Sequence, residues 1–104
     1  MDNVSIILTT YGSEDEAASA AKAMIERKLA ACSTLFRVRS IYTWERRVED
    51  GFEYLVIYKT TSSKADKLKE EILKIHSYKV PELLEIKVDS VGESYLRWIL
   101  DVLA

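Results

Sequence analysis

The sequence predicts a single α+β domain in which strands and helices follow the order βαββαβ, with one further helix at the C-terminal end. Four segments show the alternating apolar pattern of strands, three show the spacing of amphipathic helices, and capping or turn residues separate them. The 104 residues are enough for one core and too few for two. With 48% hydrophobic residues, three glycines and one proline, disordered segments are disfavoured. We therefore expect residues 1–104 to form one folded domain.

The first strand and the first helix are expected before residue 30. Residues 4–10, VSIILTT, form a β-branched run that ends at Tyr11-Gly12, as buried strands do before a turn. Ser13 stands three residues before Glu16, the spacing of a capping box at a helix start. The apolar positions that follow recur at helical spacing: Ala17, Ala21, Met24, Ile25 and Leu29.

A long β-hairpin is expected next. Residues 31–44 alternate, with Phe36, Tyr42 and Trp44 on one parity, which predicts a long strand. Asp50-Gly51 supplies the residues of a reversing turn, since glycine accepts a positive φ at little cost. Residues 52–61 alternate again and form the second strand of the hairpin.

The remaining elements complete the fold. Ser63 and Asp66 are expected to cap a second helix that continues to about His76, and Pro81 prevents its continuation. Residues 83–88 read as a fourth strand and residues 93–103 as a C-terminal helix. The order of elements is that of the split βαβ, ferredoxin-like sandwich, in which two helices cover one face of a four-stranded antiparallel sheet.

The hairpin carries apolar and aromatic side chains on both of its faces. In a ferredoxin-like domain one face of the sheet has no helices over it, so a lone subunit would expose a large apolar patch and an open edge. Association with further copies would cover both. We therefore interpret the aromatic hairpin as an assembly surface, and packing as a better explanation of its aromatics than a ligand pocket.

Composition excludes several functional classes. The net charge of −2 disfavours a general nucleic-acid binder, which needs clustered cations. The single cysteine cannot form an intramolecular disulfide, and the first residues show neither a basic segment nor an apolar signal, so we expect a cytoplasmic protein. We expect no membrane contact, because no stretch approaches the roughly 20 apolar residues that cross a bilayer.

Catalysis is also disfavoured. The chain has one histidine, and it lacks the G-x-S-x-G nucleophile motif and the glycine-rich phosphate loops. An RNA-recognition module shares the order of elements, but its aromatic K/R-G-F/Y-G/A-F motif is missing. We therefore expect no enzyme, no catalytic residues and no organic cofactor.

Several short motifs, in order over most of the chain, resemble the CutA, or divalent-cation-tolerance, family. They are LAACS at 29–33, SIYTWE at 40–45, YKTT at 58–61, HSYKVPE at 76–82 and SYLRWI at 94–99. The resemblance implies a ferredoxin-like subunit, a homotrimer built through extended hairpin strands, and a role in tolerance to copper and other divalent metal ions. It implies no defined reaction.

The resemblance also implies two sets of site residues. Cys32, His76 and Glu82 match the positions proposed for metal coordination in CutA-like proteins, and thiolate, imidazole and carboxylate together could hold copper or zinc. The trimer interface is expected at five aromatic positions of the hairpin: Phe36, Tyr42, Trp44, Tyr54 and Tyr58.

Each candidate ligand also has a purely structural explanation. Cys32 could be a small buried residue at a strand start, His76 could end the second helix, and Glu82 could pair with a surface cation. An alternative function is a trimeric sensor or scaffold that resembles the PII architecture and binds a small anion or a partner protein between subunits. Its support is a group of four arginines, which could equally be a solvated face: Arg37, Arg39, Arg46 and Arg47.

Overall fold

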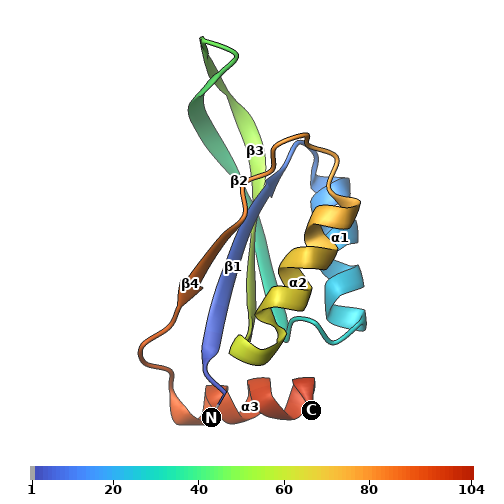
Figure 1. The fold of residues 1–104 in the computed structure, drawn as a ribbon, viewed down its shortest axis with the longest axis vertical. Coiled ribbons are helices and arrows are strands. Elements are labelled where there is room, and N and C mark those ends of the chain that lie inside the picture. The colour runs from blue at the N-terminus through green and yellow to red at the C-terminus, as the bar shows by residue number, and fades with distance from the viewer. Residues whose placement is uncertain (1) are drawn as a thin grey trace.

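Four strands form one antiparallel sheet with the strand order β2-β3-β1-β4, and this is the ferredoxin-like arrangement that the sequence predicts. The structure is a computed structural model that describes residues 2–104. Figure 1 shows the sheet with α1 and α2 packed beside it and α3 across its lower end. The elements are β1 (Val4–Tyr11), α1 (Glu14–Glu26), β2 (Cys32–Trp44), β3 (Arg47–Thr61), α2 (Ser62–Ile75), β4 (Leu84–Lys87) and α3 (Glu93–Leu103).

Helix α1 begins as the sequence predicts. The side chain of Ser13 accepts a hydrogen bond from the backbone N–H of Glu16, and three acidic residues occupy the first turn, where the helix dipole favours negative charge. Its buried face consists mostly of alanines, which bring the helix close to the sheet: Ala17, Ala20, Ala21 and Met24.

Helix α2 begins differently from the prediction. Ser63 and Asp66 do not cap it, because Ser63 lies inside the helix and Thr61 at the N-cap makes no side-chain cap hydrogen bond. Instead the carboxylate of Asp2 accepts hydrogen bonds from the N–H of Ser63 at 2.9 Å and from its hydroxyl at 2.6 Å. A residue distant in sequence therefore supplies the cap, because Asn3, next to β1, accepts a hydrogen bond from the N–H of Ser62 and so holds Asp2 beside the start of α2.

The reversal between β2 and β3 lies at Glu45-Arg46 rather than at the predicted Asp50-Gly51. Trp44 pairs with Arg47, and both residues between them have positive φ, 49° for Glu45 and 66° for Arg46. Gly51 has no positive φ and pairs with Ser40 inside the ladder. The prediction failed because thirteen residue pairs, from Cys32–Lys59 to Trp44–Arg47, fix the register over the whole hairpin.

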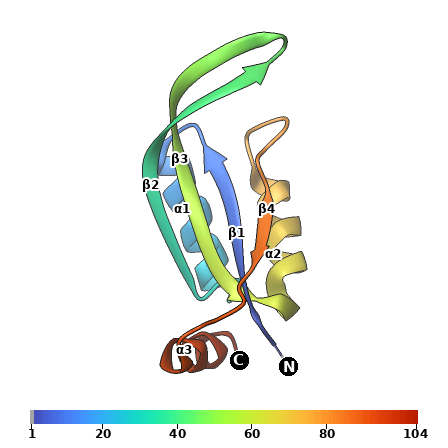
Figure 2. The ribbon, with the colours of Figure 1, turned by 90° about the vertical axis from the view of Figure 1, so that its left-hand side faces the viewer.

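The hairpin is longer than the rest of the sheet. Strand β1 stops pairing with β3 at Tyr11–Tyr54, so residues 38–53 of the hairpin pair only with each other among residues 2–104. We call residues 38–53 the arm. In Figure 2 the arm extends beyond the other strands and its tip bends toward the side of β1 and β4.

Two apolar clusters stabilise the subunit. The main one lies between the sheet and helices α1 and α2 and includes Ile7, Met24, Leu68 and Ile72. The smaller one joins α3 to the end of the sheet through Val4, Ala31, Ile99 and Leu103. The opposite face of the sheet, which α1 and α2 do not cover, is called the open face below.

Candidate functional site

His76 lies directly after α2 and against the end of β1. Its ring stacks on the ring of Tyr11, with centroids 4.3 Å apart and planes inclined by 8°. The Nε2 atom lies 2.9 Å from the carbonyl oxygen of Thr10 and 3.2 Å from the hydroxyl of Thr9, and Nδ1 accepts a hydrogen bond from the N–H of Tyr78. Because Nδ1 accepts, the proton is on Nε2 and is donated to the Thr10 carbonyl.

Both ring nitrogens of His76 are therefore engaged within the subunit. A metal ion needs a nitrogen lone pair, and the lone pair of Nδ1 is already used by Tyr78. In this geometry His76 connects the segment 76–83, which we call the α2–β4 loop, to β1. His76 therefore has a structural role at the end of α2, which is the alternative to metal binding that the sequence left open.

Glu82 lies in the α2–β4 loop, and its side chain is exposed. Cys32 lies at the start of β2, where Lys59 Nζ is 3.9 Å from its Sγ and 2.7 Å from the Thr34 hydroxyl. Burial raises the pKa of the nearby Tyr95, and Cys32 contributes to that rise. Cys32 therefore has a half-buried environment of its own, made by β3 and α3.

The structure does not bring the three predicted metal ligands together in one subunit. Cys32 pairs with Lys59, which pairs with Ile6, whereas His76 contacts β1 at Thr9 and Thr10. Three to four residues along a strand correspond to about 10–13 Å. Across residues 2–104, no three His, Cys, Asp or Glu side chains form a group that could hold a metal ion.

The aromatic positions of the hairpin differ in exposure. Phe36, Tyr42 and Trp44 keep 48%, 47% and 40% of their surface exposed, and Tyr54 is half-buried. Tyr58 has no exposed surface, so its prediction as an interface residue is wrong. It pairs with Ile7 in the layer that faces α1 and α2, because its parity places it in the core.

Exposed apolar side chains continue across the open face. The pairing registers place Leu8 between Ile57 and Leu84, and Ile6 between Lys59 and Ile86. Leu84 and Ile86 on β4 remain 52% and 49% exposed. These β4 positions were not predicted as part of the exposed surface, although the alternation of Leu84 and Ile86 with charged residues is visible in the sequence. The stacked pair Tyr95 and Trp98 adds exposed aromatic surface on α3.

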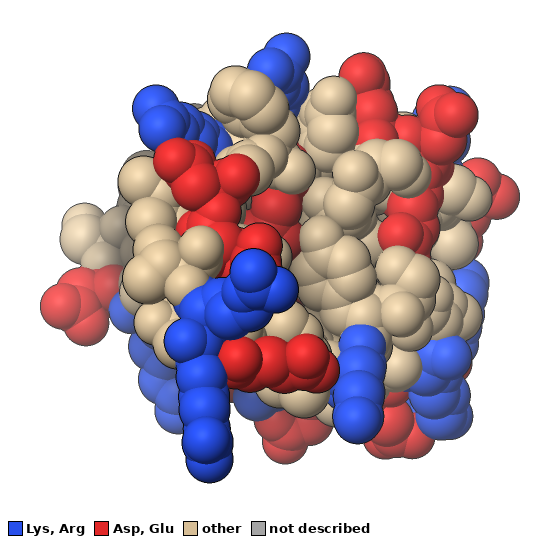
Figure 3. Space-filling model, turned by 90° about the horizontal axis from the view of Figure 1, so that it is seen from above, with Lys and Arg blue, Asp and Glu red and all other residues tan. Residues whose placement is uncertain are grey.

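The arginine group is partly engaged within the subunit. The guanidinium of Arg37 lies 3.7 Å from the centroid of the Phe52 ring, and Arg39 donates to both carboxylate oxygens of Asp50 at 2.8 and 2.7 Å. Figure 3 views the molecule from above, where Lys and Arg side chains appear together with Asp and Glu and uncharged surface lies between them. The contacts of Arg37 with Phe52 and of Arg39 with Asp50 weaken the interpretation of the four arginines as an anion site.

A groove of about 1000 Å³ lies between the arm and the α2–β4 loop. We call it the arm groove; it is lined by residues 39–44 and 77–82 together with Thr10 and Glu53. Tyr78 donates a hydrogen bond from its hydroxyl to Glu53 at 2.8 Å, and its ring lies next to Gly12, where a Cβ would stand 3.4 Å from the Tyr78 hydroxyl. Of the predicted ligands, Glu82 alone lines this groove.

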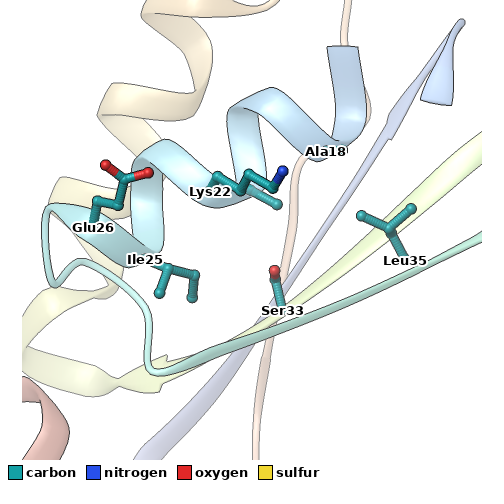
Figure 4. Close-up of a pocket in the computed structure, with 7 residues that line it drawn as sticks. Ala18, Lys22, Ile25, Glu26, Ser33 and Leu35 are labelled. Carbon is teal, nitrogen blue, oxygen red and sulfur yellow. The ribbon is translucent and has the colours of Figure 1, made fainter. Parts of the chain in front are cut away.

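A smaller hollow of about 320 Å³ lies between α1 and β2. Figure 4 shows Ala18, Lys22, Ile25 and Glu26 on the helix, opposite Ser33 and Leu35 on the strand. Its charged lining residues come from α1 alone, and it contains none of the predicted site residues.

The fold and these surfaces define a ferredoxin-like α+β subunit with a projecting hairpin arm and an apolar open face. Residues 5–102 match the family model described as CutA1 divalent ion tolerance protein, so the chain belongs to this family. The sequence is 35% identical to the divalent-cation tolerance protein CutA of Pyrococcus horikoshii, over 92% of this chain and 94% of that protein.

Solved structures agree with this assignment. The crystal structure of CutA1 from Ehrlichia chaffeensis superimposes with a TM-score of 0.94 at 28% identity, and the alignment covers 100% of this chain and 98% of that one. The structure of CutA from Archaeoglobus fulgidus, described as a periplasmic divalent cation tolerance protein, gives a TM-score of 0.92 at 34% identity over 100% of both chains. No helix within residues 2–104 of this chain is long and apolar enough to cross a membrane.

Proposed function

We propose that this chain acts as a cytoplasmic homotrimer in tolerance to divalent metal ions, with copper as the metal that it binds. The observation that carries the proposal is the match of residues 5–102 to the divalent ion tolerance family. The apolar open face and the exposed aromatics of the arm support assembly. The proposal contains no catalytic step.

The two edges of the sheet support a ring of subunits. Strands β2 and β4 are the edges, and they differ in length and side chains. Pairing between two different edges is heterologous, and such contacts close into a ring when the rotation between subunits permits. The number three comes from the family resemblance, and the arms would cover open faces of neighbouring subunits.

Native mass spectrometry and light scattering test the assembly. The expected mass is three times the 11.9 kDa of the subunit. Ile86→Lys on the open face should dissociate the trimer, whereas Leu73→Lys on α2 should leave it intact, although the two side chains are equally exposed at 49% and 50%. A monomeric or dimeric wild-type protein would contradict the proposal.

Cys32, His76 and Glu82 do not lie close enough together in one subunit to hold a copper ion by themselves. Copper binding therefore needs further ligands. Cys32 stands in the same row of the open face as Lys59, Ile6 and Ile86, a place that assembly would cover. Its soft thiolate favours Cu(I), whereas the carboxylate of Glu82 suits harder ions. We infer that any metal site forms between subunits, with Cys32 as its first candidate ligand and with His76 able to take part only if Tyr78 releases Nδ1.

Titration of the assembled protein with Cu(I), Cu(II) and Zn(II) tests the metal site. Cys32→Ala should weaken Cu(I) binding by at least about tenfold, because it removes the only thiolate ligand. Cys32→Ser serves as the matched control for packing. If the double variant Cys32→Ala, His76→Ala binds all three ions as the wild type does, neither residue is a metal ligand.

A second candidate is a PII-like trimeric sensor or scaffold that binds a small molecule or a partner protein. The arm groove, at about 1000 Å³, is the observation that favours it, since drug-sized ligand pockets have volumes of about 300–1,000 Å³. The engagement of Arg37 and Arg39 within the subunit argues against an anion as the ligand. Native mass spectrometry of protein purified from its host distinguishes the candidates, because retained metal supports the first and a retained organic molecule the second.

A further inference from the structure

The hollow between α1 and β2 lies beside an edge strand of the sheet. We call it the α1–β2 hollow. Its walls are apolar at Ala21, Ile25 and Leu35, and two charged residues of α1, Lys22 and Glu26, also line it. Both charged side chains are exposed, and neither forms an ion pair within residues 2–104. The hollow therefore offers an apolar surface with unpaired charges beside an open strand edge.

Two charged residues of β4, at the other edge of the sheet, lie on the same face as this hollow. Glu85 pairs with Ile7, which is buried in the main cluster beneath α1 and α2. Lys87 follows two residues later and so lies on the same face as Glu85. Ser33 of β2 belongs to the same row as Glu85, because Ser33 and Ile7 both pair with Tyr58. The two edges therefore carry these side chains on one face and at one level.

Lys87 is the charged residue of β4 that has no partner within the subunit. The carboxylate of Glu85 accepts a hydrogen bond from the hydroxyl of Ser5 at 2.9 Å and another from the ammonium of Lys69 at 2.6 Å. Lys87 is exposed, and in the described part of the chain it forms no ion pair. Because β4 is an edge strand, a second subunit can reach its ammonium.

The two edges also match in direction. Strands β1 and β2 both run antiparallel to β3, and β4 runs antiparallel to β1. A ring that joins β2 of one subunit to β4 of the next closes by rotation about an axis along the strands, which preserves strand directions and roughly preserves the level of each row.

In such a ring, β4 of the neighbouring subunit runs antiparallel to β2. The partner subunit's Lys87 then lies beyond the level of Ser33, toward the start of β2. The last turn of α1 lies at that end, because α1 leads into β2. In Figure 4, Glu26 lies toward the Ser33 end of the hollow, away from Leu35. This arrangement brings an unpaired ammonium beside an unpaired carboxylate.

We propose that the α1–β2 hollow receives β4 of the neighbouring subunit, with the stem of the partner subunit's Lys87 against Ile25 and its ammonium paired with Glu26. A lysine fits such a place because its hydrocarbon stem packs on apolar walls while its ammonium stays at the rim. Lys22 stands one helical turn before Glu26, on the side of the partner subunit's Glu85, so each charge of α1 faces an opposite one.

This inference rests on the homotrimer proposed above and adds the contact that selects which two edges meet. Complementary charges fix the register of an interface and disfavour wrong pairings. A strand beside β2 also covers its open edge.

Cross-linking of the assembled protein tests the position of the neighbouring strand. The background is Cys32→Ser, which removes the only cysteine, and native mass spectrometry first establishes the assembly of each variant. Glu26→Cys combined with Lys87→Cys should be joined by a short bismaleimide into covalent dimers and trimers on a denaturing gel. Within one subunit these two positions lie at opposite edges of the sheet, so such bands report contacts between subunits.

The matched control uses the other end of the same helix. Glu14→Cys removes the same charge from an exposed position that lies about 18 Å from Glu26 along α1. Combined with Lys87→Cys, it should give monomers on the same gel.

Charge reversal tests the ion pair itself. Lys87→Glu places a carboxylate against Glu26 and should speed the exchange of subunits between isotope-labelled and unlabelled trimers by about threefold or more, measured by native mass spectrometry. Adding Glu26→Lys to Lys87→Glu should restore the wild-type exchange rate. Adding Glu14→Lys instead changes the net charge equally and should restore nothing.

The outcomes distinguish this contact from the trimer as such. Cross-links between positions 26 and 87 together with rescue by Glu26→Lys support the contact. A trimer that gives no such cross-links, or equal exchange rates with and without Glu26→Lys, overturns the contact and leaves the homotrimer intact. A monomeric wild-type protein overturns both. If Lys87→Glu does not fold, the cross-linking result decides the case.

Discussion

The ring of His76 lies flat against the ring of Tyr11, with centroids 4.3 Å apart, and so connects the end of α2 to the last residue of β1. Tyr11 is fully buried, and His76 adds hydrogen bonds to the Thr10 carbonyl and from the Tyr78 N–H. The histidine that the family resemblance identifies as a metal ligand therefore has a full set of structural contacts. The consequences can be measured.

Replacing His76 with alanine should destabilise the protein without added metal. The stack and the hydrogen bonds each contribute roughly 0.5–1.5 kcal/mol, so we expect a loss of about 2 kcal/mol in the free energy of unfolding. Urea denaturation at fixed protein concentration measures it. Val80→Ala, in the same loop and 65% exposed, should change little. A loss no larger than that of the control would show that His76 does not fasten the loop.

The hairpin turn should be improved by residues that accept positive φ. Glu45 and Arg46 both adopt it, and a two-residue turn of this kind favours Asn-Gly. The double variant Glu45→Asn, Arg46→Gly should stabilise the arm by about 1 kcal/mol, seen as slower amide hydrogen exchange in residues 38–53. Gly51→Ala should be tolerated, because its φ is not positive and no atom lies within 4 Å of the added Cβ. Faster exchange in the double variant would contradict the turn geometry.

The end of α1 offers a second position for glycine. Lys28 has a φ of 58°, and the N–H groups of Lys28 and Leu29 bond the carbonyls of Ile25 and Met24, as in a Schellman motif. Lys28→Gly should raise the free energy of unfolding by about 0.5–1 kcal/mol, since glycine adopts this φ without strain. Lys22→Gly, within α1, should lower it by about 1 kcal/mol. Thermal denaturation distinguishes the two, and a destabilised Lys28→Gly protein would argue against strain at residue 28.

Asp2 should contribute to the stability of α2. The carboxylate of Asp2 caps this helix through Ser63, and the hydrogen bond from the Ser63 side chain lowers the pKa of Asp2. Asp2→Ala should cost about 1 kcal/mol, as losses of N-caps do. Asp66→Ala, the capping residue that the sequence suggested, should cost less because its side chain is 96% exposed. Chemical denaturation would refute the distant cap if the two costs were reversed.

Acid should weaken the contact between α1 and α2. Lys74 and then Arg27 lower the pKa of Glu71 from 4.5 to about 2, and the Arg27–Glu71 distance is 2.6 Å. Because the folded-state pKa is lowered, this stabilisation is complete above about pH 4.5 and is lost as the pH falls toward 2. Urea midpoints between pH 6 and pH 2.5 should fall less steeply in Glu71→Gln than in the wild type. Glu70→Gln is the exposed control, and equal slopes in all three proteins would exclude this role for Glu71.

The order of elements could be predicted from local patterns. The capping box at Ser13 and the helical spacing in residues 93–103 depend on neighbours in sequence, and both elements appear where expected. The ferredoxin-like class followed from that order. The hairpin turn was predicted at the wrong position, because Asp50-Gly51 is a strong local turn signal. The observed turn at Glu45-Arg46 is instead set by the register of the thirteen residue pairs from Cys32–Lys59 to Trp44–Arg47.

The candidate site was less predictable. Cys32, His76 and Glu82 could be selected by residue type and family motif, but their distances depend on which strands become neighbours. The half-buried Glu53 gave no signal in the sequence, because its exposure depends on Tyr78 reaching it from a loop 25 residues away.

By itself, the sequence determined the fold class, the long hairpin and the family, since periodicity, caps and short motifs are properties of adjacent residues. The tertiary structure alone decided that Tyr58 belongs to the core, that Asp2 caps α2 and that both nitrogens of His76 are engaged. Each of these depends on the register of paired strands and on contacts between distant segments. A shift of one residue in that register would move every side chain of a strand to the other face.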